Sequence, residues 1–301
     1  MSHTSHIPIL LEPIVDYLKE PFLNETKPSI LIDCTLGGGG HTQAFLNQIP
    51  LHHQVLSIDQ DMEAIERAST HFKSEIESNR LILVHSRFSD LAKILTSLER
   101  PVLGLMADFG FSSDQLDKAD RGLSFLKDGP LDMRLDQSSG VTAYEFLKKI
   151  REDELVKVLS EYGEERFSRR IASAIILAKK SGDLPKTTLG LARLIESSVP
   201  PPARHGRIHA ATRSFQAIRI AINGEISEID ELLTRGILGL QTGARVAFLS
   251  FHSLEDRRVK ETLKNKELWS LFNKKPIEAQ EKELALNPRA RSAKLRMAEK
   301  K

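Results

Sequence analysis

Apolar residues in the first third of the chain follow two alternating spacings. Short apolar runs at 30–34, 54–59, 80–85 and 102–108 have the length and composition of buried strands. The stretches between them, such as HTQAFLNQI and DMEAIERASTHFKSEI, carry apolar residues at helical spacing. Strands that alternate with helices predict a parallel sheet with helices on both faces, which is a doubly wound, Rossmann-like α/β fold.

This alternation stops after Asp108 and resumes only at a predicted strand over 244–251. The gap is far longer than the roughly dozen residues that a crossover between parallel strands needs. Its sequence is mostly amphipathic helix, as in EDELVKVLSEY and EERFSRRIASAIILAKK. We therefore predict a core built from residues 1–112 and 212–301, interrupted by an inserted helical subdomain over 113–211.

A glycine turn, residues 37–40, directly follows the first predicted strand and leads into a helix. Glycine lets the backbone turn tightly and approach a ligand, and the helix N-terminus offers unpaired N–H groups. The second strand ends at Asp59, where a carboxylate can accept hydrogen bonds from both ribose hydroxyls. Together these features predict a nucleotide-like cofactor, whereas the turn alone would indicate only a flexible loop.

The spacing of the glycines favours S-adenosylmethionine over a dinucleotide. In the G-x-G-x-x-G pattern that accommodates a pyrophosphate, the third glycine would fall on Thr42 of this chain. A methyl donor joined to ribose through sulfur has no phosphate and does not need that spacing. A nicotinamide-dependent oxidoreductase is the alternative that these residues leave open.

The string Asp108-Phe109-Gly110-Phe111 closes the fourth predicted strand. It resembles the strand end of amino-methylating enzymes, although it lacks their prolines. Asp108 could orient an exocyclic amine and Phe111 could stack a flipped base, or the string could be only a tight turn. Phe88, after the third strand, could pack on the adenine or anchor the helix that follows.

Several other chemistries lack their required residues. Cys34 lies within the first strand and has the position of a small buried residue, so it is no nucleophile for carbon methylation. The D-F-G string lacks the catalytic-loop H-R-D of kinases, and none of the ten histidines has H-E-x-x-H spacing. The single cysteine and the absence of a long apolar run predict a cytoplasmic protein without a membrane span or a metal.

The net charge of +2 does not itself indicate nucleic-acid binding, but basic residues are clustered. Each cluster is either an RNA-binding surface or a solvated charged face. The clusters are Arg166, Arg169 and Arg170; Arg204, His205, Arg207, His209 and Arg213; and Arg289, Arg291, Lys294, Arg296, Lys300 and Lys301.

Eight longer strings occur in one order along the chain: TLGGGGHT, SSDQLD, RGLSF, DGPLDMR, YGEERFSRRIA, ATRSFQAIRIAIN, SFHSLEDRRVK and NPRARSAKLR. With them, nearly the whole chain resembles the small-subunit ribosomal RNA cytosine-N4 methyltransferase family of the MraW/RsmH type. The resemblance implies S-adenosylmethionine-dependent N4-methylation of a cytidine in the decoding region (P site) of 16S rRNA. It also implies the small ribosomal subunit as partner and a substrate-recognition role for the inserted subdomain.

The resemblance carries site residues onto this chain. The family commonly has Asp-Leu-Gly-Val where this chain has residues 108–111, which weakens the case for base stacking by Phe111. The implied cofactor contacts are Gly39, Gly40, His41, Asp59, Phe88, Asp108 and Gln115.

Two of the strings have no assigned chemistry. We expect Asp132 and Arg134 of DGPLDMR, and His252 and Ser253 of SFHSLEDR, to line the substrate side. Methyl transfer to a neutral amine needs mainly alignment and removal of one proton, so Asp108 is our catalytic candidate. His252 with Glu255 could instead only cap a helix.

Other functions stay open at this point. A methyltransferase acting on another nucleic acid or on protein would share the cofactor residues, and a non-catalytic ribosome-assembly factor would share the basic clusters. The oligomeric state is open, with a homodimer as one option.

Overall fold

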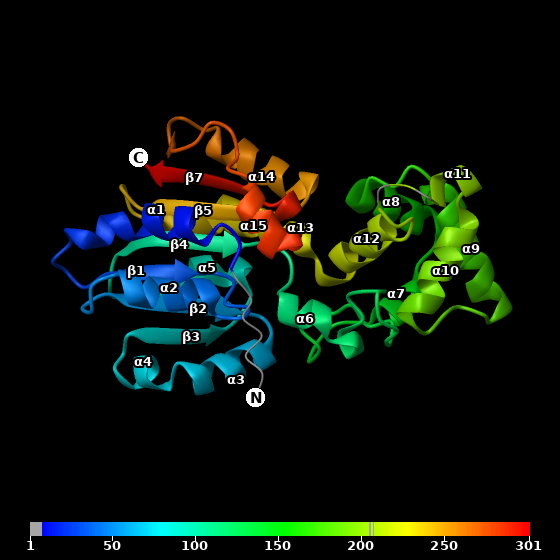
Figure 1. Cartoon of the computed structure of the whole chain (residues 1–301), viewed down its shortest axis with the longest axis horizontal. Helices are drawn as coiled ribbons and strands as arrows, with labels where there is room; N and C mark the ends of the chain where they lie inside the picture. The colour runs from blue at the N-terminus through cyan, green and yellow to red at the C-terminus, as the bar shows by residue number, and fades with distance from the viewer. Residues whose placement is uncertain (1–7, 205, 207) are drawn as a thin grey trace. The chain divides into compact units, whose positions relative to one another are not determined.

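The computed structural model describes residues 8–301 apart from 205 and 207, and leaves the side chain of Ser113 undescribed. His205 and Arg207 of the predicted basic clusters therefore lie outside the described residues. The chain forms two compact units (Figure 1). We call Met1–Gly110 with Ile226–Lys301 the sheet unit, and Phe111–Glu225 the helical unit.

The sheet unit is built on one seven-stranded sheet with the order β3-β2-β1-β4-β5-β7-β6. The first five strands are parallel, and β7 runs antiparallel to both β5 and β6. The strands are β1 (Ile30–Asp33), β2 (Gln54–Asp59), β3 (Leu81–His85), β4 (Val102–Asp108), β5 (Arg245–Ser250), β6 (Trp269–Leu271) and β7 (Lys294–Lys300).

Helices cover both faces because successive side chains of a strand point to opposite sides. Leu31 of β1 belongs to the core cluster that includes Phe22 and Phe45. Its neighbours Ile30 and Ile32 belong to the cluster on the other face. In Figure 1 the helices α1 (Leu11–Leu23) and α2 (Gly40–Gln48) lie in front of the strands.

The remaining helical elements of this unit are short. They are α3 (Met62–His71), α4 (Lys73–Glu77), a 3-10 turn (Phe88–Asp90), α5 (Leu91–Thr96), α13 (Glu225–Glu231, which begins at the last residue of the helical unit), a π-helical turn (Leu232–Gly236), a 3-10 turn (Ile237–Gly239), α14 (Ser253–Leu263), α15 (Glu281–Leu286) and a 3-10 turn (Pro288–Ser292).

The predicted doubly wound sheet is confirmed, and all five predicted strands are present. The strands β6 and β7 were not predicted. They extend the sheet with antiparallel pairs beyond β5. No helix of the described residues is long and apolar enough to cross a membrane.

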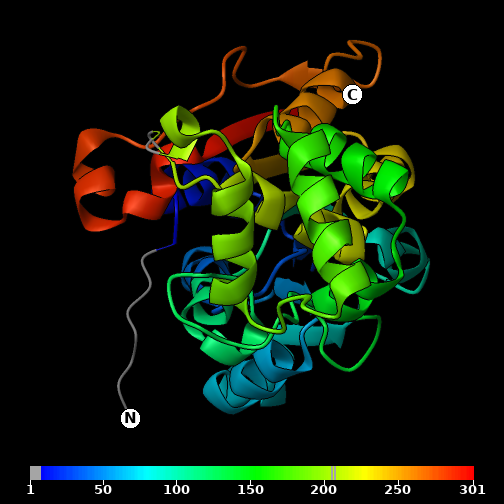
Figure 2. The same ribbon diagram turned by 90° about the vertical axis from the view of Figure 1, so that its right-hand side faces the viewer.

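The helical unit has its own core. Leu155, Leu159, Ile171, Ile175 and Ile195 are fully buried within it. Figure 2 turns its green and yellow-green helices toward the viewer. They are α6 (Ser113–Asp117), a 3-10 turn (Ala119–Arg121), α7 (Ala143–Lys149), α8 (Glu152–Gly163), α9 (Ser168–Ser181), α10 (Thr188–Ser198), α11 (Pro201–Arg204) and α12 (Thr212–Asn223).

The observed end of this unit differs from the expected return to the core at residue 212. The apolar face of α12, with Phe215, Ala217 and Ile218, is buried in the helical core, so the unit continues to Glu225. The start, Phe111, lies close to the expected residue 113.

Candidate active site

The carboxyl ends of the parallel strands form the candidate site of the sheet unit. Because β1 lies between β2 and β4, the chain connections from these strands diverge at this point of the sheet. Open α/β sheets bind ligands outside the carboxyl ends of the strands at such a switch point. The glycine turn follows β1, while Asp59 and Asp108 end β2 and β4.

The glycine turn requires glycine for two separate reasons. Gly37 and Gly39 have φ angles of 52° and 78°, which side chains with a Cβ rarely adopt. A Cβ on Gly39 would also lie 2.9 Å from the ring of Phe72, and one on Gly40 would lie 2.4 Å from Pro8. The turn is therefore packed closely from behind and opens α2 with its backbone N–H groups.

His41 joins this turn to the segment before α1. It is 7% exposed, and its Nε2 lies 3.2 Å from the carbonyl oxygen of Ile9. Burial lowers the pKa of His41 to about 4, so the imidazole is neutral near pH 7. This contact holds residues next to Pro8 over the glycine turn.

Asp59 is already oriented by the backbone. Its Oδ2 accepts a hydrogen bond from the amide of Gly37 at 2.8 Å, and its Oδ1 accepts from the amide of Asp61 at 2.8 Å. Each carboxylate oxygen keeps a further lone pair, so the side chain can still accept bonds from a ribose. Burial raises the pKa of Asp59 to about 6.

Asp108 has a buried oxygen without a protein partner. Its backbone amide donates to Thr35 Oγ1 at 2.7 Å. This bond connects the end of β4 to the loop that follows β1. Its Oδ1 has no hydrogen-bond partner among the described residues. Burial raises the pKa of Asp108 well above its usual value, and the charges of Asp33 and Glu255 raise it further.

Sequence reasoning missed two members of this group of carboxylates. Asp33 is fully buried, accepts from Thr42 Oγ1 at 2.7 Å, and has a pKa raised by burial to about 6. Glu255 is 1% exposed and accepts from the amide of Phe251 at 2.7 Å. Their positions in the sequence could have indicated them. Asp33 ends an apolar strand, and Glu255 is the third helical residue after a cap residue.

These carboxylates fit a cationic cofactor. Four acids, Asp33, Asp59, Asp108 and Glu255, lie at one edge of the sheet, and three of them have raised pKa values. A buried carboxylate without a partner is costly unless a cation or a hydrogen-bond donor pairs with it. S-adenosylmethionine carries a sulfonium and an ammonium, so it supplies both.

The aromatic residues near this edge pack mainly against one another. The Phe88 ring is partly buried, with its centroid 5.9 Å from that of Phe109, which in turn stacks on Phe248 at 6.0 Å. Phe88 thus packs against the hydrophobic core near the carboxyl end of β3. The adenine contact of Phe88 stays a prediction.

His252 and Ser253 begin α14. His252 is the N-cap residue, its Nδ1 accepts from the Glu255 amide at 3.4 Å, and Glu255 bonds back to the His252 amide at 3.3 Å. The helix-capping interpretation of His252 is therefore confirmed. Ser253 is exposed at the first position of the helix. No described group of three His, Cys, Asp or Glu side chains could hold a metal ion.

The other predicted site residues lie in the helical unit. Gln115 caps α6, because its side chain accepts from the Ser112 amide at 3.0 Å while Ser112 Oγ accepts from the Gln115 amide at 3.2 Å. The guanidinium of Arg219 lies 4.6 Å from the ring centroid of Phe111 and binds Glu225 at 2.7 Å. One face of Phe111 is therefore covered by Arg219.

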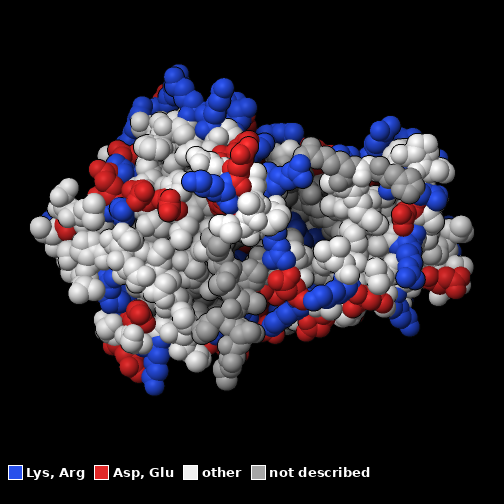
Figure 3. Space-filling model, viewed as in Figure 1, with Lys and Arg blue, Asp and Glu red and all other residues white. Residues whose placement is uncertain are grey.

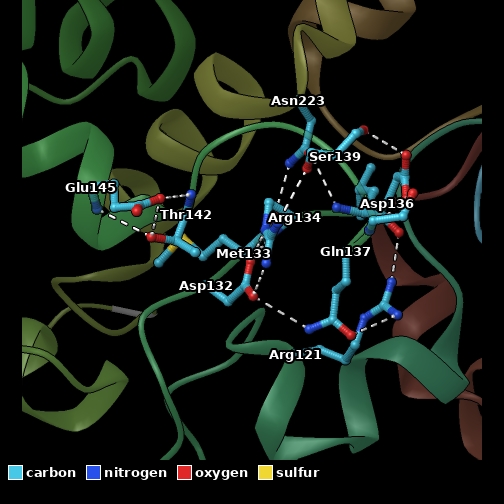
Figure 4. Close-up of polar contacts among 12 residues, drawn as sticks. Arg121, Asp132, Met133, Arg134, Asp136, Gln137, Ser139, Thr142, Glu145 and Asn223 are labelled. Carbon is cyan, nitrogen blue, oxygen red and sulfur yellow. Dashed lines mark hydrogen bonds and ion pairs between the residues drawn. The ribbon is translucent and has the colours of Figure 1, made fainter.

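Asp132 and Arg134 form a closed polar network (Figure 4). Arg134 donates to both carboxylate oxygens of Asp132, at 2.7 and 2.9 Å. Burial raises the pKa of Asp132, but the hydrogen bonds and charge of Arg134 outweigh it and hold the pKa below its usual value. Asn223 fixes the same loop by donating to the Met133 carbonyl at 2.9 Å and accepting from the Leu135 amide at 2.8 Å.

Met133 occupies the left-handed region at φ 63°, which is unusual for a residue with a side chain. Such a conformation persists only when the surrounding contacts fix it. The network around Asp132 and Asn223 supplies those contacts.

Comparisons with known proteins identify relatives over nearly the whole chain. The chain is 43% identical over 296 residues, 98% of this chain and 95% of the relative, to Ribosomal RNA small subunit methyltransferase H of Synechococcus sp. (strain RCC307). It is 44% identical over 277 residues, 92% and 86% of the two chains, to the protein of that name in Sorangium cellulosum (strain So ce56). A third relative of that name, from Acinetobacter baylyi (strain ATCC 33305 / BD413 / ADP1), is 43% identical over 98% of this chain and 99% of its own length.

The family description and these names confirm the prediction of a methyltransferase and agree with S-adenosylmethionine as cofactor, which ends the oxidoreductase alternative. The family model that matches covers residues 3–301. The chain belongs to the MraW methylase family.

Proposed function

We propose that this protein transfers a methyl group from S-adenosylmethionine to the exocyclic N4 of a cytidine in the decoding region (P site) of small-subunit 16S rRNA. The names of its relatives support small-subunit ribosomal RNA as the substrate, and the choice of a cytidine N4 rests on the family resemblance. The observation that carries the chemistry is the buried, unpartnered Oδ1 of Asp108 beside the glycine turn and Asp59.

The cofactor supplies an activated methyl group on a positively charged sulfur. Backbone amides of the glycine turn and the Asp59 carboxylate would hold it at the carboxyl edge. Asp108 would accept a hydrogen bond from the cytosine amine. This bond would aim the nitrogen lone pair at the methyl carbon. The N–C bond forms as the C–S bond breaks, and the amine loses one proton.

Asp108 would receive that proton. Its pKa is raised by burial and by the neighbouring carboxylates, so it is a stronger base than an exposed aspartate once it is ionised. A bound cation would favour the ionised form before transfer. Positioning and proton removal are then supplied by one side chain.

The helical unit is proposed to recognise the RNA substrate. Arg169 is exposed on α9, and the loop that carries Arg134 is held rigidly by Asn223. Arg169 would contact a phosphate of the RNA. Because Arg134 is paired with Asp132, its role in such recognition would be to order the loop rather than to offer an uncompensated charge.

The test uses small ribosomal subunits that lack the modification. Labelled methyl transfer would be measured, and the product nucleoside identified by mass spectrometry. We expect N4-methylcytidine from one site with the natural protein, and loss of transfer with Asp108→Asn. Asp16→Asn, at an exposed carboxylate of α1, is the matched control. Another methylated nucleoside, or none, would refute the proposed substrate.

A further inference from the structure

The basic residues near the C-terminus lie in two places. Arg296 is 9% exposed and donates to both oxygens of Asp256 at 2.6 and 3.2 Å. Lys300 and Lys301 donate to backbone carbonyl groups within the sheet unit. These three side chains are used in holding β7 in place.

The second group lies at the edge of the sheet where the candidate active site is found. Because β7 is antiparallel to β5 and Lys294 pairs with Ser250, β7 begins at the carboxyl end of β5. The preceding 3-10 turn carries Arg289 and Arg291, and both are exposed. We call Pro288–Lys294 the basic edge segment.

The backbone of the basic edge segment is firmly anchored. Ala290 and Ala293 are each 1% exposed, so its small side chains point inward while the arginines point outward. Asn287 Oδ1 accepts from the Arg289 amide at 3.2 Å at the start of the turn. Residues that present charge from a fixed backbone lose little entropy when they bind a ligand.

A chain of contacts connects this segment to the glycine turn. In α15, directly before the segment, Glu283 accepts from the amide of Leu10 at 2.7 Å. The neighbouring carbonyl of Ile9 contacts His41 at 3.2 Å, at the first turn of α2. The basic edge segment and the glycine turn therefore share one rim of the sheet unit.

Three arginines of the other basic clusters contact backbone carbonyl groups. Arg170, Arg204 and Arg213 donate to backbone carbonyls at the ends of α8 and α10, at 3.2, 3.1 and 3.3 Å. Figure 3 shows Lys and Arg gathered at the top left of the face and mixed with Asp and Glu over much of the rest, so the surface charge alone does not single out one RNA-binding surface. The basic edge segment differs from the other basic clusters because it lies on the same rim of the sheet unit as the glycine turn.

We propose that the basic edge segment binds the backbone phosphates of the RNA strand whose base enters the carboxyl edge of the sheet. This inference rests on the proposed methylation of RNA and adds the surface that holds the strand. The paired N–H groups of a guanidinium match the spacing of phosphate oxygens. Such contacts fix the position of an RNA strand but do not depend on its base sequence. Base choice would remain with the residues around Asp108.

The test measures binding of a synthetic single-stranded RNA over a range of salt concentrations. Arg289→Ala combined with Arg291→Ala should weaken binding about tenfold at low salt. The slope of log affinity against log salt should fall by about 1.4, because each lost phosphate contact on a single strand accounts for about 0.7. Lysine at both positions should keep most of the slope.

The control is Lys274→Ala with Lys275→Ala, which removes the same charge from exposed residues after β6. Affinity for S-adenosylmethionine should be unchanged in both double variants, which shows that the rim is intact. The proposal is overturned if the arginine variant keeps the natural slope, or if the lysine control loses as much.

The methyl-transfer assay separates this proposal from the proposed function. If the natural protein methylates small subunits and the arginine variant keeps its KM and its salt slope, only the RNA-binding surface is wrong. The opposite result is that the natural protein transfers no methyl group to RNA while the salt slope depends on the arginines. In that case the RNA-binding surface is supported and the proposed methyl transfer to RNA is wrong.

Discussion

Aspartates in the two units have opposite surroundings. In the sheet unit, Asp108 is buried with an unpartnered oxygen, and burial raises its pKa. In the helical unit, Asp132 is also buried, but Arg134 binds both of its oxygens and its pKa is lowered. The helical unit thus pairs its acid within the fold, whereas Oδ1 of Asp108 has no partner among the described residues of the sheet unit.

The largest expected effect is on catalysis. Asp108→Asn should reduce methyl transfer at least about a hundredfold, because a positioned base contributes on the order of 10²–10⁴. The unfolding free energy in urea should not fall, because Asn has nearly the same shape and the raised pKa of Asp108 already disfavours its charged form in the ligand-free fold. A large loss of stability would contradict the contrast between the units.

The next effect is on stability. Asp132→Asn should destabilise the helical unit by about 2 kcal/mol, because it leaves the partly buried Arg134 without its bidentate partner. Urea unfolding followed by circular dichroism would measure this loss. Asp136→Asn in the same loop, where the side chain is exposed to a greater degree, serves as the control. Equal losses in the two variants would argue against a special role for the Asp132 pair.

A smaller effect is expected at the glycine turn. Gly39→Ala and Gly182→Ala both place a side chain at positive φ, 78° and 84°, but only the first meets a neighbour, Phe72 at 2.9 Å. Each should cost about 1 kcal/mol for the backbone, with more at residue 39 from the clash. Thermal unfolding and cofactor titration together measure the difference. Loss of cofactor affinity at residue 182 would be unexpected.

The smallest expected effect is on pH dependence. Burial raises the pKa of both Asp33 and Asp59 to about 6, so the ligand-free fold binds extra protons between about pH 4 and pH 6. Its stability should therefore fall as the pH rises through this range. Affinity for the cationic cofactor should rise severalfold over the same range, measured by calorimetry. Asp59→Asn should flatten this rise, and a pH-independent affinity would argue against ionised acids at the site.

The parallel strands could be predicted because each is a short apolar run followed by a polar residue. Asp59 and Asp108 were found in this way, since the carboxyl ends of parallel strands meet at one edge. The strand β7, with the sequence KLRMAEK, reads as polar because it contains four charged residues. Its buried Arg296 is satisfied by Asp256, a partner that sequence spacing does not reveal.

The end of the inserted unit could not be predicted for a related reason. The apolar face of α12 has the same helical spacing whichever core it packs against. Only the contacts of Phe215 and Ile218 assign it to the helical unit. Glu255 was considered only as part of a helix cap, because its effect on Asp108 depends on strands far apart in the sequence.

The Arg219 contacts described above have a consequence for how this architecture can change. Phe111 and Glu225 are the first and last residues of the helical unit, and one guanidinium binds both. An insertion whose two ends are held together interrupts its host at a single place. Related chains could therefore lengthen, shorten or exchange the helical unit while the sheet keeps its strand order. An engineered protein could also replace the helical unit with a short linker from Gly110 to Ile226.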